Sequence, residues 1–306
     1  MSSTPGSPTP GRAGSRARPG VSLTDVTLVA MALIWGVNIP VVKMGTQMMA
    51  PLAYNGVRVA IAAASLLVIG ALGGRSWPSR AQVLTLLGLG VLGNGLYQVF
   101  FIEGIARTRA GSAALVLAAT PAFVALIGRL RGVERISSRG MLGIALSVAG
   151  IGLVVYGGAA RAEGQGTLVG NLLVLAGTMC WALFTVLLKP HTHEVNGVQL
   201  TALTLAGGAI PLLVVASPAI AATDWPSVPA GAWAAITFSG LGALVIAYLF
   251  YNRGVRLIGP TRTAMYGNLQ PIIALLVAWL TLGEIPTMWQ GLGAGSIMTG
   301  LLMTRM

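Results

Sequence analysis

This chain has few charged residues and few of the side chains that enzymes commonly use for catalysis. Only 8% of its 306 residues are charged, whereas a soluble domain carries about a quarter. It contains seven acidic residues, two histidines and a single cysteine. Cys180 lies within an apolar run, so neither a disulfide framework nor a thiolate metal cluster is available. We therefore expect no metal, no cofactor and no enzymatic activity.

Apolar residues make up 55% of the chain, and the mean hydropathy is +0.81. Apolar runs of 18 residues or more recur along the sequence, each long enough to cross a hydrocarbon core of about 30 Å. The net charge of +12 does not indicate nucleic-acid binding, because the basic residues are scattered between the apolar runs. This pattern predicts an all-α protein that spans a lipid bilayer several times.

Ten membrane-spanning helices are expected once the apolar runs are separated at their Gly, Pro, Ser and charged residues. The expected spans are 24–43, 51–73, 83–105, 110–130, 139–157, 167–188, 197–219, 230–252, 261–282 and 287–303. Residues 1–20 are rich in Ser, Thr, Pro and Gly with three arginines, which predicts a disordered tail.

Lysine and arginine set the expected orientation. With the N-terminus in the cytoplasm, cytoplasmic segments contain 14 basic residues and external segments contain four, and Arg58 is left inside a span. Because cytoplasmic segments are enriched in lysine and arginine, we expect both termini in the cytoplasm and the protein in the cytoplasmic (inner) membrane.

The second half of the chain repeats the first. LAATPAFVALIGRLRGVE ends at Glu134, GNLQPIIALLVAWLTLGE ends at Glu284, and Pro121 and Pro271 occupy the same place in each. The offset of 150 also relates three pairs of glycines, and an offset of 146 relates Trp35 to Trp181. We predict a first repeat over 21–157, an external linker over 158–166 and a second repeat over 167–306.

Five spans per repeat is an odd number, so the second repeat enters the membrane in the opposite orientation. The connection after the first proline contains four arginines and its counterpart contains none, as this inversion requires. Inverted repeats are typical of secondary transporters, in which a central site opens to each side in turn. Pro121 and Pro271 are expected either to act as bending points or to form static kinks.

The chain resembles the EamA type of the drug/metabolite transporter superfamily. The similarity rests on ALIWGVNIPVVK in the first span, Arg58 in the second, and the proline followed by GVE or LGE in each half. GVE departs from the more usual LGE. The resemblance covers residues 24–303 and implies ten helices, two inverted repeats and export or exchange of small metabolites, including amino acids.

Polar side chains recur at helical spacing inside the spans and predict a central cavity, because such groups usually face the protein interior or water. The alternative is that they only hold helices together or anchor span ends at the interface. The expected cavity residues are Trp35, Asn38, Arg58, Asn94, Tyr97, Gln98, Trp181, Tyr248, Tyr266 and Gln270.

Arg58 is the only charge well inside a span, and a charge at this depth requires a partner or a path to water. It could bind a solute carboxylate, or pair with Glu103 in an external gate. It could equally cap the carbonyl groups at the end of a neighbouring helix. The sequence leaves these three roles open.

The seven acidic residues lie in loops or near span ends, so no carboxylate is placed as a proton relay in mid-membrane. We therefore expect facilitated diffusion or exchange of an amphipathic solute, amino acids foremost, unless Glu103 titrates. Broad export of cationic compounds, an integral membrane lipid-modifying enzyme and a non-transporting subunit are the alternatives. The protein is expected to be a monomer or a homodimer.

Overall fold

The computed structural model describes residues 22–132, 137–160 and 165–304, and within these ranges the chain is helical and contains no strand. This confirms the expected all-α fold. The predicted tail over 1–20 and Glu134 lie outside the described residues, and the predicted linker over 158–166 is only partly described.

The first half contains seven α-helices and one π-helical segment. They are α1 (Leu23–Met48), α2 (Pro51–Leu72), α3 (Arg80–Gly90), η1 (Val91–Leu96), α4 (Tyr97–Arg107), α5 (Ala110–Leu117), α6 (Thr120–Leu130) and α7 (Ser138–Ala160). The segments α3, η1 and α4 are continuous and form one span, and α5 and α6 together form the next span.

The second half follows the same plan. It contains α8 (Gln165–Leu188), α9 (His191–Glu194), α10 (Gly197–Ala221), η2 (Trp225–Ser227), α11 (Ala230–Thr237), η3 (Phe238–Ile246), α12 (Ala247–Ile258), α13 (Pro260–Tyr266), η4 (Gly267–Leu269), α14 (Gln270–Leu282) and α15 (Met288–Thr304). The π-helical segments η1 and η3 occupy equivalent places, because residues 91–96 correspond to 241–246 at the offset of 150.

Nine helical stretches in the described ranges have 18 residues or more and are apolar enough to cross a membrane. They coincide with the first nine expected spans. The tenth expected span corresponds to α15, which is 17 residues long as described and reaches the lower end of the spanning range.

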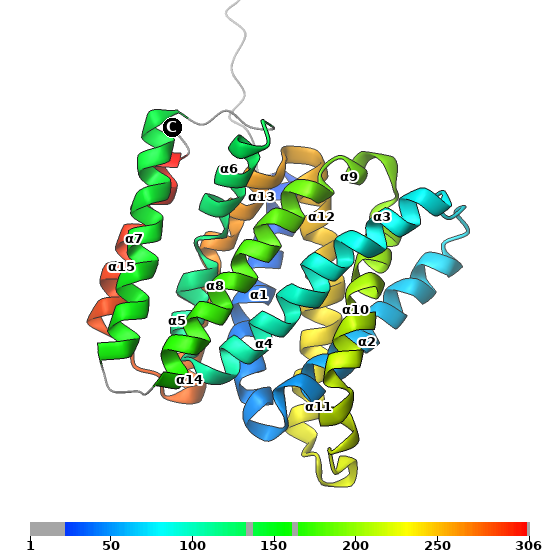
Figure 1. Ribbon diagram of the computed structural model, residues 1–306, viewed down its shortest axis with the longest axis horizontal. Helices are drawn as coiled ribbons and strands as arrows, with labels where there is room; N and C mark the ends of the chain where they lie inside the picture. Colours follow the sequence, from blue (N-terminus) through cyan, green and yellow to red (C-terminus); the bar gives the residue numbers. More distant parts are fainter. Residues whose placement is uncertain (1–21, 133–136, 161–164, 305–306) are drawn as a thin grey trace, which may run out of the picture.

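The two halves are inverted relative to each other (Figure 1). We call the end of the bundle where α1 begins and α15 ends the termini face. The helix α6 ends at the termini face, whereas its counterpart α14 ends at the opposite face. Both described ends of the chain therefore lie at one face, as an even number of spans requires.

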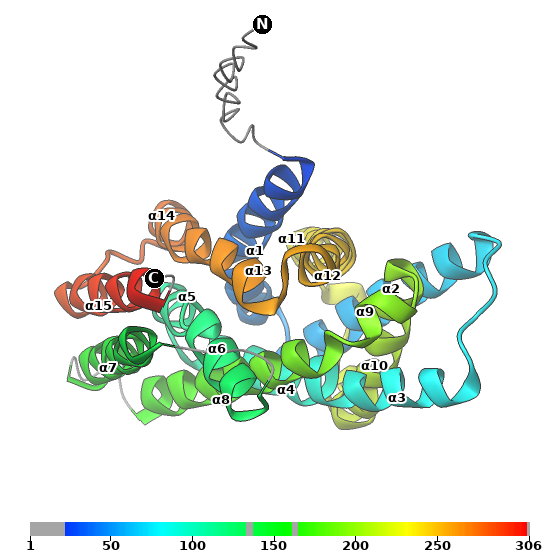
Figure 2. The same ribbon diagram turned by 90° about the horizontal axis from the view of Figure 1, so that it is seen from above.

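The repeats interleave because the first helix of each repeat packs against helices of the other repeat. Figure 2 shows α1 among α12, α13 and α14, and α8 beside α4 and α6. Two further pairs, α7 with α15 and α2 with α10, lie at the two ends of the arrangement in this view. We call α1 with α11–α14 the α1 group, and α8 with η1 and α4–α6 the α8 group.

Equivalent residues of the two repeats touch one another along the line between them. Gln98 donates to the hydroxyl of Tyr248 at 3.3 Å, and Ser147 donates to the carbonyl of Ile297 at 3.4 Å, both across an offset of 150. Such contacts occur where a pseudo-twofold axis passes between the partners. The axis lies in the membrane plane because the repeats are inverted.

Glycine permits the closest helix contacts near this axis. A Cβ atom on Gly150 of α7 would lie 2.8 Å from the carbonyl oxygen of Gly293 on α15, and one on Gly293 would lie 2.8 Å from the carbonyl oxygen of Gly150. Helices in membranes approach this closely where small residues face each other. The paired glycines of the two repeats therefore bind α7 to α15.

The two repeat prolines begin new helical segments. Pro121 is the second residue of α6, directly after the break between α5 and α6. Pro271 is the second residue of α14, directly after the tight turn η4. A proline at this position sacrifices no intrahelical hydrogen bond. Each of these spans is thus broken at its centre. Whether the breaks bend during transport stays a prediction.

Replacing Gly150 with leucine should separate α7 from α15 and lower the free energy of unfolding by about 1–3 kcal/mol, because overpacking forces backbone shifts. The matched control is Gly152→Leu on the same helix, where a Cβ would meet no atom within 4 Å. Unfolding in mixed micelles by increasing sodium dodecyl sulfate would measure both variants. Equal stability of the two variants would contradict the packing role.

Candidate functional site

A cavity lies at the centre of the bundle between the two helix groups. It encloses about 680 Å³ of space between atoms, open solvent included. Its polar and aromatic lining residues are Trp35, Asn38, Arg58, Tyr97, Gln98, Phe101, Thr120, Trp181, Tyr248, Tyr251 and Gln270. They come from both repeats.

Arg58 lines the cavity and is 1% exposed. Its guanidinium donates from Nε to Asn55 at 2.8 Å, from Nη1 to Ser239 at 2.5 Å and from Nη2 to Gln98 at 2.6 Å. Ser239 in turn donates to the side-chain oxygen of Asn38 at 2.6 Å. We call these five residues the Arg58 cluster. It joins α1, α2, α4 and η3.

The positive charge of Arg58 has only neutral partners. All three acceptors are amide or hydroxyl oxygens, and no aspartate or glutamate lines the cavity in the described ranges. The rings of Tyr54 and Phe101 lie 5.9 and 5.5 Å from the guanidinium carbon and add weak cation–π attraction. A buried charge without a counter-ion is costly, so the cavity attracts an anionic group.

Five aromatic side chains line the cavity beside the Arg58 cluster: Trp35, Tyr97, Trp181, Tyr248 and Tyr251. We call them the aromatic wall. Tyr248 accepts a hydrogen bond from Gln98 of the Arg58 cluster. Their rings pack against one another with centroids 5.1–5.9 Å apart. Rings in mutual contact form a continuous surface and not an open cage, so the wall suits an apolar or flat part of a solute.

A sequence model of the EamA-like transporter family matches residues 22–156 and, a second time, residues 168–306. The chain belongs to the EamA-like transporter family. The double match agrees with the two-repeat layout seen in the fold, and it makes the protein a multi-pass membrane transporter. This confirms the resemblance recognised from the sequence.

Relatives of this EamA-like transporter extend over nearly the whole chain. It is 25% identical to the uncharacterized transporter YyaM of Bacillus subtilis, over 90% of this chain and 92% of the relative. It is 27% identical to the uncharacterized inner membrane transporter YedA of Escherichia coli K12, over 84% and 86%. A crystal structure with 18% sequence identity superposes with a TM-score of 0.67, over 93% of this chain and 99% of the other.

Most residues predicted to line the transporter's cavity do so. The structure places there Trp35, Asn38, Arg58, Tyr97, Gln98, Trp181, Tyr248 and Gln270, together with Pro121. Pro271 is buried but does not line the cavity. The residues brought together come from seven spans, so both repeats contribute to the site.

Asn94 lies outside the cavity, contrary to the prediction. The π-helical segment η1 turns it toward α10, where its backbone and Cβ pack against Gly208. Its amide is fully buried, and neither of its polar atoms has a hydrogen-bond partner among the described residues. Spacing on a regular helix placed it beside Gln98, and the π-helical segment changes that register.

Tyr266 and Glu103 also lie elsewhere. Tyr266 lines a separate pocket with Asn268 and Ile272, and its hydroxyl donates to Asp25. Glu103 pairs with Arg107, one turn along α4. The expected Arg58–Glu103 pair is therefore not formed in this structure, and Arg58 caps no backbone carbonyl either.

Three residues of the site were not predicted from the sequence: Tyr251, which lines the cavity, and Asn55 and Ser239, which belong to the Arg58 cluster. Asn55 lies three residues before Arg58, a helical spacing that could have revealed it. Tyr251 has the same spacing from Tyr248. Ser239 is an isolated serine in a largely apolar run, and serines in membrane helices often bond to their own backbone, so its sequence context carries no distinguishing signal.

The histidine-rich turn α9 is remote from the cavity. His191 pairs with Glu194, and His193 lies 3.3 Å from the amine of Lys189. In the described ranges no group of three or more His, Cys, Asp or Glu residues could hold a metal ion. The cavity lining offers a positive charge, hydrogen-bonding groups and aromatic surface.

Replacing Ser239 with alanine should lower the free energy of unfolding by about 1–3 kcal/mol, because it leaves Arg58 Nη1 and the Asn38 oxygen buried without a partner. Ser217→Ala is the matched control, since Ser217 is exposed and donates only to the carbonyl of Val214. It should change stability by less than about 0.5 kcal/mol. Denaturant titration of both variants in micelles would measure the loss of unfolding free energy. Equal losses in the two variants would contradict the role of Ser239 in the Arg58 cluster.

Proposed function

We propose that this protein carries small amphipathic metabolites, amino acids foremost, across the cytoplasmic membrane by alternating access, as an exporter or exchanger. The observation that carries the proposal is that one cavity is lined both by the guanidinium of Arg58, which has neutral partners, and by the aromatic wall. A solute that carries a carboxylate and an apolar group matches both features.

The carboxylate is proposed to replace the neutral partners of Arg58. Ser239 and Gln98 each hold one terminal nitrogen of the guanidinium, and a carboxylate can accept from both nitrogens at once. The exchange gains charge compensation in a medium of low dielectric constant, where attraction between opposite charges is strong. Ser239 and Gln98 would then be released to bond the solute or water.

The aromatic wall supports an apolar or aromatic side chain on the solute and argues against cation export. A cation is held either by a carboxylate or inside a cage of ring faces. The described cavity offers no carboxylate, it already contains one positive charge, and its rings pack on each other. A broad exporter of cations would face repulsion from Arg58.

The inner-membrane location is proposed from the excess of basic residues on one side, with both termini in the cytoplasm. YedA, to which the chain is 27% identical, is named an inner membrane transporter. A monomer suffices for this mechanism, because one chain supplies every residue of the cavity.

Replacing Arg58 with glutamine should reduce counterflow of labelled amino acids in proteoliposomes by at least about tenfold, because each lost charged hydrogen bond is worth about 1.5–3 kcal/mol. Arg80→Gln is the matched control, since Arg80 is exposed at the start of α3. Size-exclusion chromatography of both variants would confirm folding. Unchanged counterflow by a folded Arg58→Gln protein would reject the role of Arg58 in binding.

An imposed pH gradient should not drive accumulation of the same amino acids, since no acidic side chain in the described ranges lines the cavity and could carry a proton with the solute. The measurement compares uptake into proteoliposomes with and without a proton ionophore. Uptake above equilibrium that the ionophore abolishes would overturn this expectation and would direct attention to Glu103.

A further inference from the structure

The connection between α4 and α5 is held at the opposite face by two ionic side chains from the α1 group. Lys43 of α1 donates to the carbonyls of Ile105, Ala106 and Thr108 at 2.7–3.0 Å. Glu284, which follows α14, accepts from the backbone N–H groups of Ala110 and Gly111 at 3.0 and 3.1 Å. The cation thus meets a helix C-terminus and the anion a helix N-terminus, the arrangement that helix dipoles favour.

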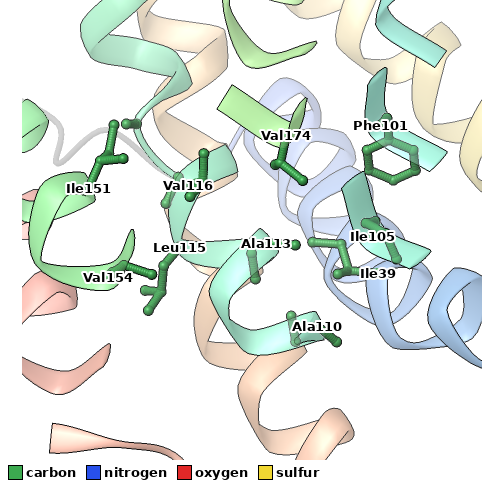
Figure 3. Packing of buried hydrophobic residues seen from close by; sticks show 14 of the residues in the cluster. Ile39, Phe101, Ile105, Ala110, Ala113, Leu115, Val116, Ile151, Val154 and Val174 are labelled. Atoms are coloured by element: carbon green, nitrogen blue, oxygen red, sulfur yellow. The ribbon is translucent and has the colours of Figure 1, made fainter. Parts of the chain in front are cut away.

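These contacts lie over a closed apolar layer between the cavity and the opposite face. The layer consists of Val42, Ile102, Ile105, Ala110 and Ala113, none of which has exposed surface or lines the cavity. Figure 3 shows Ala110 and Ala113 of α5 beside Ile105 of α4 and Ile39 of α1. The layer therefore lies on the opposite-face side of the cavity-lining residues Ile39 and Phe101.

The lysine contacts do not distinguish the two faces, because each repeat makes an equivalent contact in this structure. Lys189, the counterpart of Lys43 at an offset of 146, donates to the carbonyls of Val255 and Arg256 at the termini face at 2.8 and 3.1 Å. The lysine contacts therefore do not single out the opposite face. Glu284 makes a further ionic contact with the α4–α5 connection, on the side where α14 ends.

The local structure of the LGE motif explains how Glu284 reaches α5. Gly283 ends α14 in the left-handed region with φ 66°, a conformation that glycine adopts readily, and this turn sends the chain back toward α5. Arg109 reinforces the contact, with Nη2 donating to the carbonyl of Ile285 at 2.8 Å and Nε 3.9 Å from Glu284. In the first repeat the left-handed glycine is Gly132, one position earlier, which accounts for GVE in place of LGE.

We propose that Glu284 is the latch that keeps the cavity closed at the opposite face and has to release α5 when that face opens. Glu284 belongs to the α1 group and α5 to the α8 group, so separating the groups at this face breaks the contact. The proposal rests on alternating access as the function. It adds a gating role for the glutamate of the repeated motif, at a position distinct from Glu103, Pro121 and Pro271.

The test measures access to the cavity and requires no solute. In a Cys180→Ser background, Ile39→Cys places a thiol in the cavity beneath the apolar layer. A membrane-impermeant maleimide is applied to cells and to inverted vesicles. A reference cysteine at exposed Asp224, in the α10–α11 connection, identifies the preparation in which the opposite face is reachable.

Glu284→Gln should raise the labelling rate at position 39 from the opposite face about tenfold, because a neutral amide cannot accept from both N–H groups with a full charge. The matched control is Glu103→Gln, an acid near the same face whose pairing with Arg107 stays within α4, and it should leave the rate unchanged. Glu284→Asp keeps the charge but is shorter, and should give a smaller rise.

An unchanged rate in folded Glu284→Gln protein, or an equal rise in Glu103→Gln, would overturn the latch. If Glu284→Gln fails to fold, the decision passes to Glu284→Asp, where an unchanged rate has the same meaning. Increased labelling in a protein that carries no solute would support the latch while rejecting the proposed function. Solute flux without increased labelling would do the reverse.

Discussion

The structure depends on one constraint, the burial of a guanidinium whose hydrogen-bond partners among the described residues are all neutral. Arg58 draws one acceptor from each of three elements, α2, α4 and η3, and through Ser239 it fixes Asn38 of α1. The elements α1, α2 and α4 belong to the first repeat and η3 belongs to the second. The charge therefore holds the halves together at the cavity while leaving the electrostatic demand that an anionic solute can meet.

Near the pseudo-twofold axis, residues that the repeat relates contact each other and have different roles. Gln98 and Tyr248 are equivalent by repeat, yet one is an amide that binds Arg58 and the other is a phenol in the aromatic wall. Sequence divergence at equivalent positions has thus given a symmetric scaffold an asymmetric site, with polar and aromatic side chains at positions that the repeat relates. Packing positions such as Gly150 and Gly293 kept the symmetry because the α7–α15 contact leaves no space for a side chain.

The fold could be predicted from sequence because hydropathy and the gapless repeat report directly on membrane crossing and inversion. The site was predicted less completely, and Asn94 shows why. Helical spacing assumes 3.6 residues per turn, and the π-helical segment η1 adds a residue to the turn and rotates Asn94 away from the cavity. Ser239 was missed since its partner lies 181 residues away, and a lone serine carries no long-range signal.

The exchange of first helices has a consequence for how the protein is made. As the chain leaves the ribosome, α4 and α6 enter the membrane before α8, the helix that covers them, has been synthesised. The helix α1 lacks its packing partners α12 and α14 for longer still, because they are synthesised near the end of translation. Neither repeat can complete its own packing, so the two mature together, and the lipid bilayer or the insertion machinery has to shelter the unfinished first repeat in the meantime.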